Sequence, residues 1–131
     1  MPVSDPSTVV DLEFRPEPSV VQTARDATNV VAAFISPSKL DDLRLLTSEL
    51  VTNSVKHAGL TSDDWVRLKL ILRDGRVHVE VRDPGAGFVV PDAPRPGGVS
   101  GWGLYFLDRI ADRWGMTHDR DTCAWFELDV A

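Results

Sequence analysis

Hydrophobic and polar residues recur along this chain with two different periods, which separate predicted strands from predicted helices. The segment TVVDLEF (8–14) alternates well enough for a strand, and two prolines then interrupt it. From Ser19 to Ile35 the apolar residues recur at intervals of three and four, which is the period of one helical face. This pattern predicts a helix that ends at the SPS of 36–38.

A second helix is predicted over about 39–58 from the residues at its two ends. Ser38 is placed to cap it, and Asp41, three residues later, completes a start that is similar to a capping box. Gly59 is placed to close the same helix in a left-handed turn.

The segment WVRLKLILRDGRVHVEVRD (65–83) predicts a β-hairpin, because two alternating runs flank Asp74-Gly75, a dipeptide suited to a two-residue turn with positive φ. If Arg73 pairs with Arg76, one face of the hairpin is apolar and the other is largely polar. Such a sheet has helices on one side and water on the other, which makes a two-layer α/β sandwich. The register then places Leu72 opposite Val77, Leu70 opposite Val79, Leu68 opposite Val81 and Lys69 opposite Glu80.

The rest of the chain predicts a loop, a short helix and a last hairpin. Residues 84–101 contain four prolines and five glycines, too many for regular structure, and the segment is long enough to be a functional loop. A helix is predicted in GLYFLDRIADRW (103–114), ended by Gly115. The following segment, 115–130, predicts a hairpin whose second strand turns Ala124, Phe126, Leu128 and Val130 to one face.

Composition and charge narrow the possible function classes. A chain of 131 residues with 43% hydrophobic and 26% charged residues is expected to be one globular domain (1–131) with one core. The formal net charge of −6, without a run of Lys and Arg, argues against direct nucleic-acid binding. A single cysteine (Cys123), no signal peptide and no apolar stretch of membrane-spanning length predict a cytoplasmic protein without disulfides or a membrane segment.

The predicted second helix carries three polar residues in one narrow stripe. At about 100° per residue, Asn53 lies about 40° and Lys56 about 20° from Glu49, on opposite sides of it. Any amphipathic helix has a polar stripe, so from the helix pattern alone Glu49 and Asn53 are ordinary solvated surface. The alternative is that the three residues form half of a site.

Two polar residues continue the core-facing parity of the predicted strands. Asp83 follows the inward series of its strand, and a buried carboxylate is costly unless it is given donors. Asp83 either accepts backbone N–H groups of the turn that follows it or receives a ligand. Thr122 extends the inward series of the last strand, and is either a core threonine bonded to backbone or a second polar group of the same site.

Glycine pairs flank the long loop, with Gly85 and Gly87 in DPGAGF and Gly101 and Gly103 in SGWGL. The second pair is predicted to open directly into a helix, where exposed N–H groups and close approach suit a phosphate. One G-x-G usually marks only a turn. Two such pairs around one loop, after a buried aspartate and a polar helix stripe, favour a binding site.

These motifs together resemble the GHKL ATPase/kinase superfamily, whose members share the Bergerat fold. The match spans roughly 38–128 and consists of E-x3-N-x2-K-H, then D-P-G-x-G, then G-x-G-L. LTSELVTNSVKHA, VRDPGAGF, GWGLYFLDRIADRWG and TCAWFEL are most similar to the small anti-sigma-factor kinases of bacteria. The resemblance implies a mixed, mostly antiparallel sheet covered on one face by about three helices, with 88–100 as a short ATP lid.

The resemblance also implies ATP and Mg²⁺ as cofactors and suggests a role for each motif residue. Glu49 would act as general base or orient the attacking group, Asn53 would help to hold Mg²⁺ on the ATP phosphates, and Lys56 would approach those phosphates. Asp83 would accept the adenine amino group, which favours adenine over guanine, and Thr122 would support adenine through water. The other implied ATP-binding residues are His57, Gly85, Gly87, Gly101, Gly103 and Leu104.

The function implied by the resemblance is that of a serine/threonine kinase that phosphorylates a STAS-type anti-sigma-factor antagonist and sequesters a sigma factor, with a homodimer as a family expectation. Trp102 and Asp121 depart from the family pattern, and Arg95 is the only cation in the lid. These departures leave open an ATP-binding interaction module that moves no phosphate.

Two other function classes and a zinc site have less support in the sequence. A histidine-kinase fragment would need a phospho-accepting histidine from another chain, because none of the three histidines is placed for that role. A gyrase-like or chaperone ATPase would need further domains. One cysteine and three scattered histidines give no support for a zinc site.

Overall fold

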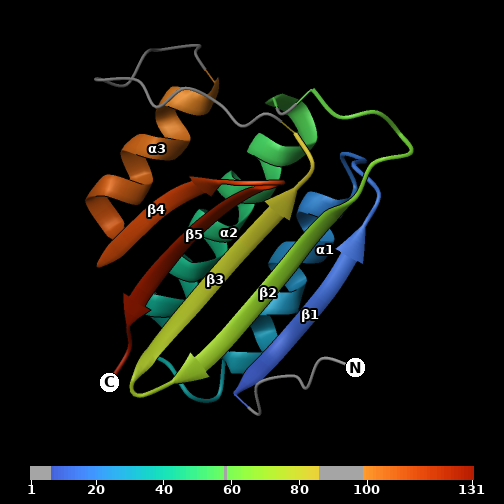
Figure 1. The fold of residues 1–131 in the computed structure, drawn as a ribbon. Coiled ribbons are helices and arrows are strands. Elements are labelled where there is room, and N and C mark those ends of the chain that lie inside the picture. Colours follow the sequence, from blue (N-terminus) through green and yellow to red (C-terminus); the bar gives the residue numbers. More distant parts are fainter. Residues whose placement is uncertain (1–6, 58, 86–98) are drawn as a thin grey trace.

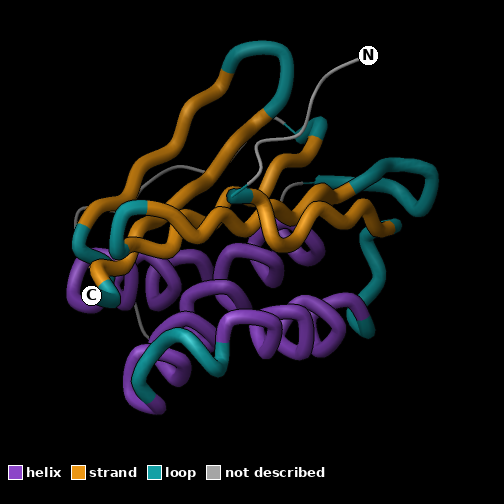
Figure 2. The backbone as a smooth tube through the Cα atoms, turned by 90° about the horizontal axis from the view of Figure 1, so that it is seen from below, coloured by secondary structure: helices purple, strands orange, loops and turns teal. Residues whose placement is uncertain are grey.

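The elements of this protein form two layers, an antiparallel sheet and a set of helices that cover one of its faces (Figure 1, Figure 2). The computed structural model describes residues 7–57, 59–85 and 99–131. The predicted two-layer α/β sandwich is confirmed. In chain order the elements are β1 (Thr8–Phe14), α1 (Val20–Ala27), η1 (Thr28–Val31), α2 (Pro37–His57), β2 (Val66–Arg73), β3 (Arg76–Asp83), α3 (Val99–Ile110), β4 (Arg113–His118) and β5 (Thr122–Asp129).

The described strands make one sheet in the order β1-β2-β3-β5-β4, and each of their pairings is antiparallel. The mixed component expected for the sheet is therefore not found in these strands. The β2–β3 hairpin has the predicted register throughout, including Arg73 opposite Arg76. Its turn residues Asp74 and Gly75 both have positive φ, 55° and 73°, as a two-residue turn that follows the strand twist requires.

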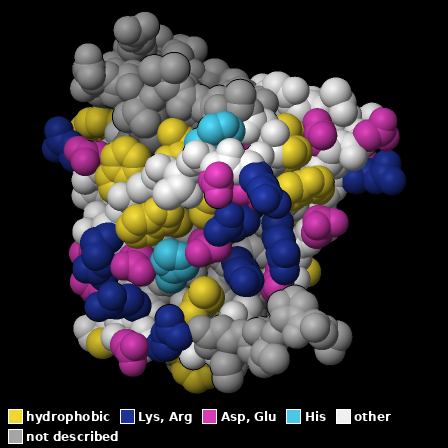
Figure 3. Space-filling view, viewed as in Figure 1, with side chains coloured by type: hydrophobic (Ala, Val, Ile, Leu, Met, Phe, Trp, Pro, Cys, Tyr) yellow, Lys and Arg dark blue, Asp and Glu magenta, His cyan; other side chains and the backbone are white. Residues whose placement is uncertain are grey.

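The hydrophobic core lies between the sheet and the helices. Alternate residues of the strands face it, because successive side chains of a strand point to opposite faces. The other face of the sheet is open and carries charged side chains of both signs (Figure 3). The largest fully buried side chains include Phe126 and Leu128 of β5, Leu68 and Leu70 of β2, and Leu43, Leu46 and Leu50 of α2.

The first helix is shorter than its apolar period predicted. α1 gives way to the 3-10 turn η1 instead of continuing to Ile35. The buried Thr28 donates its hydroxyl proton to the Arg25 carbonyl at 2.6 Å, three residues back, and this contact favours the tighter turn. Val31 is fully buried and Ile35 packs against the core, so the core-facing stripe continues past the change of helix type, while Val30 and Phe34 are 49% and 71% exposed.

The second helix begins earlier than predicted and has a different cap. α2 starts at Pro37, where the fixed φ of proline suits the first helical position. The prediction of Ser38 as N-cap is wrong, since the Oγ of Ser36 accepts the Lys39 N–H at 3.2 Å. Gly59 has φ of +70°, the left-handed conformation predicted for it. Neither α2 nor any other helix in the described part of the chain combines the length and the apolar character needed to cross a bilayer.

The third helix and the strand after it both begin before their predicted positions. α3 starts at Val99, so Gly101 and Gly103 lie within the helix rather than in a loop that precedes it. Gly115 lies in β4 instead of ending a helix. It faces Trp125 across the strands, and a Cβ at this position would be 2.9 Å from the indole nitrogen. The glycine therefore makes room for the tryptophan ring.

Candidate functional site

Asp83 ends β3 on the core side of the sheet and is 4% exposed, as the strand parity predicts. Both carboxylate oxygens have donors, because Oδ1 accepts the Gly85 N–H at 2.8 Å and Oδ2 accepts the Ser54 hydroxyl at 2.6 Å. The bond from Gly85 is the turn that was one of two explanations for this aspartate. Each carboxylate oxygen can accept two hydrogen bonds, so Asp83 keeps capacity for a further donor.

Thr122 begins β5 directly opposite Asp83 in the sheet, and its side chain is buried. Its hydroxyl donates to the Gly85 carbonyl at 2.9 Å, and the same oxygen lies 2.9 Å from Nδ1 of His118. The backbone bond expected of a core threonine is therefore present. The bond from Thr122 to the Gly85 carbonyl and the bond from the Gly85 N–H to Asp83 together hold the turn after β3. The hydrogen bond from Ser54 to Asp83 connects this turn to α2.

The polar stripe predicted on α2 differs in burial along its length. Asn53 is 1% exposed, Glu49 is half-buried and Lys56 is exposed. Burial raises the pKa of the Glu49 carboxyl, because desolvation disfavours its charged form. The interpretation of these residues as ordinary solvated surface is therefore wrong for Asn53 and does not fit the half-buried Glu49.

Asn53 is a buried residue whose side-chain amide forms no hydrogen bond within the described part of the chain. Neither its Oδ1 nor its Nδ2 has a partner among the described residues. The hydroxyls of Thr8 and Thr47 are also unpartnered there, but of these three side chains only Asn53 offers a carbonyl oxygen and an NH₂ group together. A buried polar group without a partner costs about 1–3 kcal/mol, and a bound ion or ligand is one explanation for it.

The chemistry of the Asn53 amide suits a phosphate-bound cation. Its oxygen is a ligand of the kind that Mg²⁺ prefers, and its N–H groups can donate to an anionic oxygen. Within the described residues, no group of three or more His, Cys, Asp and Glu side chains is placed to hold a metal ion. A metal here would therefore take most of its ligands from the substrate and from water, which is usual for Mg²⁺.

The hydrogen bond from Ser54 to Asp83 joins the C-terminal half of α2 to the end of β3. Asn53 is the neighbour of Ser54 and lies on the same part of the helix. Figure 1 shows the last turns of α2, the end of β3 and the start of α3 at one end of the molecule. The fold thus brings Asn53, Asp83 and Thr122 into one region.

For the remaining predicted site residues, the structure either describes the position in a helix alone or does not describe the residue. Gly87 and residues 88–98 of the predicted lid lie outside the described residues. Their predicted roles, and those of the glycines around the loop, stay predictions. Within the elements, His57 is the last residue of α2, and Gly101, Gly103 and Leu104 lie in the first two turns of α3.

Sequence reasoning missed Ser54 and His118, both of which take part in this region. Ser54 lies on the core-facing side of the helix, and a small hydroxyl there was a signal of a buried polar partner. His118 could be placed opposite Thr122 only once the register of β4 against β5 was known. The structure therefore adds two members to the predicted set.

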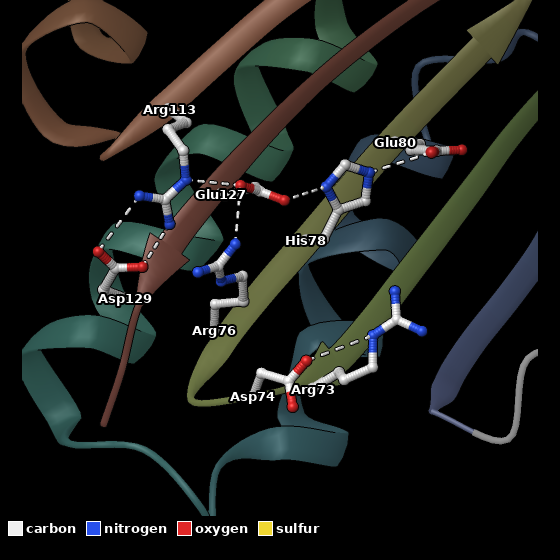
Figure 4. Close-up of polar contacts among 8 residues, drawn as sticks. All are labelled: Arg73, Asp74, Arg76, His78, Glu80, Arg113, Glu127 and Asp129. Atoms are coloured by element: carbon white, nitrogen blue, oxygen red, sulfur yellow. Dashed lines mark hydrogen bonds and ion pairs between the residues drawn. The ribbon is translucent and has the colours of Figure 1, made fainter.

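A second polar cluster lies on the open face of the sheet, opposite the side that Asp83 faces (Figure 4). His78 is bonded through Nε2 to Glu80 at 3.0 Å and through Nδ1 to Glu127 at 2.9 Å. The bond to Glu80 and the bond to Glu127 raise the pKa of His78, and the bond from His78 lowers the pKa of Glu80. Trp125 stacks on the imidazole, with ring centroids 5.6 Å apart.

This open face also has a hollow of about 280 Å³. Because strand side chains alternate between faces, the hollow is separated from Asp83 by the sheet itself. It is therefore not part of the region around Asn53 and Asp83. Its lining residues are Ile71, Arg73, Asp74, Arg76, His78, Glu80 and Glu127.

The sequence model of the histidine kinase-like ATPase domain family matches residues 14–127 of this chain. The matched range contains all the predicted site residues, from Glu49 to Thr122.

Individual proteins also resemble the chain. It is 25% identical over 125 residues to the serine-protein kinase RsbW of Listeria monocytogenes, covering 84% of this chain and 80% of that protein. It is 38% identical over 69 residues to the anti-sigma F factor of Geobacillus stearothermophilus, covering 47% of this chain and 45% of that protein.

A solved histidine kinase domain, from the blue-light activated histidine kinase of Erythrobacter litoralis EL346, has the same fold. Its TM-score is 0.59 at 17% sequence identity, and the match covers 86% of this chain and 60% of that chain. At this identity the likeness concerns the fold alone.

Proposed function

This chain belongs to the histidine kinase-like ATPase domain family, and from that premise we propose that it is an ATP-binding regulatory kinase of the anti-sigma-factor type. It transfers the γ-phosphate of ATP to a serine or threonine of an anti-sigma-factor antagonist, and it sequesters a sigma factor. The similarity to a serine-protein kinase and to an anti-sigma F factor supports both parts of this proposal.

One observation carries the proposal, namely the buried Asn53 amide, which has no partner among the described residues and lies beside the contact between Ser54 and Asp83. Local costs of this kind are kept in folded proteins at functional sites, where a ligand removes them. Oδ1 of Asn53 would be the protein ligand of Mg²⁺. When bound, Mg²⁺ supplies positive charge that offsets the charge on the phosphates.

Asp83 fits the adenine base because its carboxylate has acceptor positions beyond those that the described Ser54 and Gly85 occupy. Ser54 and Gly85 already fix the carboxylate, so its orientation is set before a nucleotide binds. The exocyclic amine of adenine is a donor, whereas guanine presents a carbonyl oxygen that a carboxylate repels. We therefore expect ATP to be selected over GTP.

Glu49 is the proposed general base of the transfer. It lies one helical turn before Asn53, and burial raises the pKa of its carboxyl. A carboxylate with a raised pKa accepts a proton from a serine or threonine hydroxyl more readily than an exposed one does. Lys56, one turn after Asn53 and exposed, is free to turn toward the phosphates.

A second candidate function is an ATP-dependent interaction module that transfers no phosphate. Arg95 as the only cation of 88–100 and Trp102 in the G-x-G-L motif favour this alternative. Asp121, the other departure from the family pattern, favours neither function. Its carboxylate is paired at 3.3 Å with Arg82, whose side chain belongs to the open face.

Purified protein with Mg-ATP and antagonist proteins from the same genome separates these functions. Calorimetry measures binding of ATP and GTP, and mass spectrometry detects phosphoserine or phosphothreonine in the antagonist. We expect ATP binding, much weaker GTP binding, and transfer that is lost in Asn53→Ala but kept in the neighbouring control Thr52→Ala. Binding without transfer to any antagonist would favour the module, and no ATP binding in the presence of Mg²⁺ would exclude both functions.

A further inference from the structure

His118 ends β4 opposite Thr122, the first residue of β5. His118 is exposed, yet its Nδ1 lies 2.9 Å from the Oγ1 of the buried Thr122. An exposed histidine is thus hydrogen-bonded to one of the most buried hydroxyls of the protein.

The direction of this hydrogen bond follows from the partners of Thr122. A hydroxyl has one proton to donate, and the Gly85 carbonyl, 2.9 Å away, can only accept. The proton of Thr122 therefore goes to Gly85, and toward His118 the threonine oxygen presents a lone pair. Nδ1 of His118 must carry a proton and donate it.

The bond from His118 begins a chain of hydrogen bonds that ends at the Asp83 carboxylate. Thr122 holds the carbonyl of Gly85, and the N–H of Gly85 donates to Asp83 Oδ1 at 2.8 Å. Ser54 holds the other carboxylate oxygen. If His118 no longer donates, the Thr122 hydroxyl can rotate away from Gly85, and one side of the turn that orients Asp83 is released.

We propose that His118 is a positioning residue of the nucleotide site, which acts through Thr122 and Gly85 to hold Asp83 in the orientation that receives adenine. This inference rests on the proposed ATP binding and adds a residue that the family motifs do not contain. His118 itself touches neither base nor phosphate in this role. Its effect belongs to the adenine end of the site, so ATP and ADP share it.

Calorimetric titration of Mg-ATP and Mg-ADP into the full chain tests the proposal. Loss of one hydrogen bond is worth roughly a tenfold change in affinity, so His118→Ala should raise both Kd values by about five- to tenfold and by the same factor. His118→Asn should recover most of the affinity, because its amide N–H can take the place of the Nδ1 proton. Thr117→Ala, the exposed neighbour whose side chain points to the open face, is the matched control and should bind like wild type.

Two further measurements distinguish positioning from a loss of fold. In a Thr122→Val background, His118→Ala should weaken nucleotide binding no further, because the two residues act on one path. Nitrogen NMR of the neutral imidazole should show the ring proton of His118 on Nδ1.

The outcomes separate this inference from the proposed function. Failure of wild type to bind Mg-ATP would overturn the ATP-binding function, and this inference with it. Wild-type binding that His118→Ala leaves unchanged, or an Nε2-protonated ring in the folded protein, would overturn the role of His118 alone. A loss in His118→Ala that His118→Asn does not recover would also overturn it, since a purely structural effect of the ring would then explain the result.

Discussion

Replacing Asn53 by alanine is expected to stabilise the ligand-free protein and to remove its stabilisation by Mg-ATP. The side chain is buried, and neither amide atom has a partner within the described residues. Each unmade hydrogen bond costs about 1–3 kcal/mol, so the two together cost at least about 2 kcal/mol. The space left by the amide costs about 1 kcal/mol. The net gain is about 1 kcal/mol in the free energy of unfolding, or about 4 °C in Tm.

Ser54→Ala is the matched control, because it also removes a small buried polar group, one residue further along α2. The Ser54 hydroxyl donates to the Asp83 carboxylate at 2.6 Å, so this polar group is satisfied. Loss of a hydrogen bond to a charged group costs about 1.5–3 kcal/mol. Alanine at position 54 should therefore destabilise the protein, opposite in sign to alanine at position 53.

Urea unfolding with and without Mg-ATP measures both effects. At a nucleotide concentration about 100 times Kd, wild type should gain about 2.7 kcal/mol in the free energy of unfolding. Asn53→Ala should gain nothing, while its ligand-free midpoint lies above that of wild type. The reasoning is refuted if Asn53→Ala is less stable than wild type by more than about 1 kcal/mol without nucleotide, or if it keeps the wild-type gain with nucleotide.

Three further predictions follow from the site and from the sheet. Glu49→Gln keeps the shape of the proposed base but cannot take a proton. Phosphate transfer in a single turnover should therefore fall about 100-fold or more, while the Kd for ATP changes little. A matching loss of ATP affinity would contradict the role of Glu49 as base. The folded pKa of His78 is raised, mainly by its hydrogen bond to Glu80. The stabilisation that the charged imidazole contributes to the fold is therefore fully present below the unfolded pKa of about 6.5, and it is lost as pH rises through the folded pKa. Urea midpoints of wild type should fall across that window, in which Glu80 and Glu127 stay ionised, and an equal fall in His78→Gln would disprove this origin. Gly115→Ala places a Cβ 2.9 Å from the Trp125 indole nitrogen. It should lower the free energy of unfolding by about 1–3 kcal/mol and change the tryptophan emission. An unchanged urea midpoint would mean that the ring moves aside freely.

The β2–β3 hairpin and its register could be predicted because their signals are local. Period-two alternation decides which side chains share a face, and Asp74-Gly75 decides where the chain reverses. The helix ends could not be predicted in the same way. Ser36 and Ser38 are both capping residues by type. The change from α1 to a 3-10 turn occurs at the buried Thr28, although Val31 and Ile35 beyond it still pack on the core.

For the candidate site, the chain by itself determined which residues to consider, since strand parity and motif spacing already single out Asn53, Asp83 and Thr122. Tertiary structure decided how they are placed. Ser54 and Asp83 are 29 positions apart, and Gly85 and Thr122 are 37 apart, so their hydrogen bonds exist only once α2 packs on the sheet and β5 pairs with β3. One polar stripe contains both the buried Asn53 and the exposed Lys56. Periodicity gives the direction of a side chain, whereas its burial depends on the element that covers it.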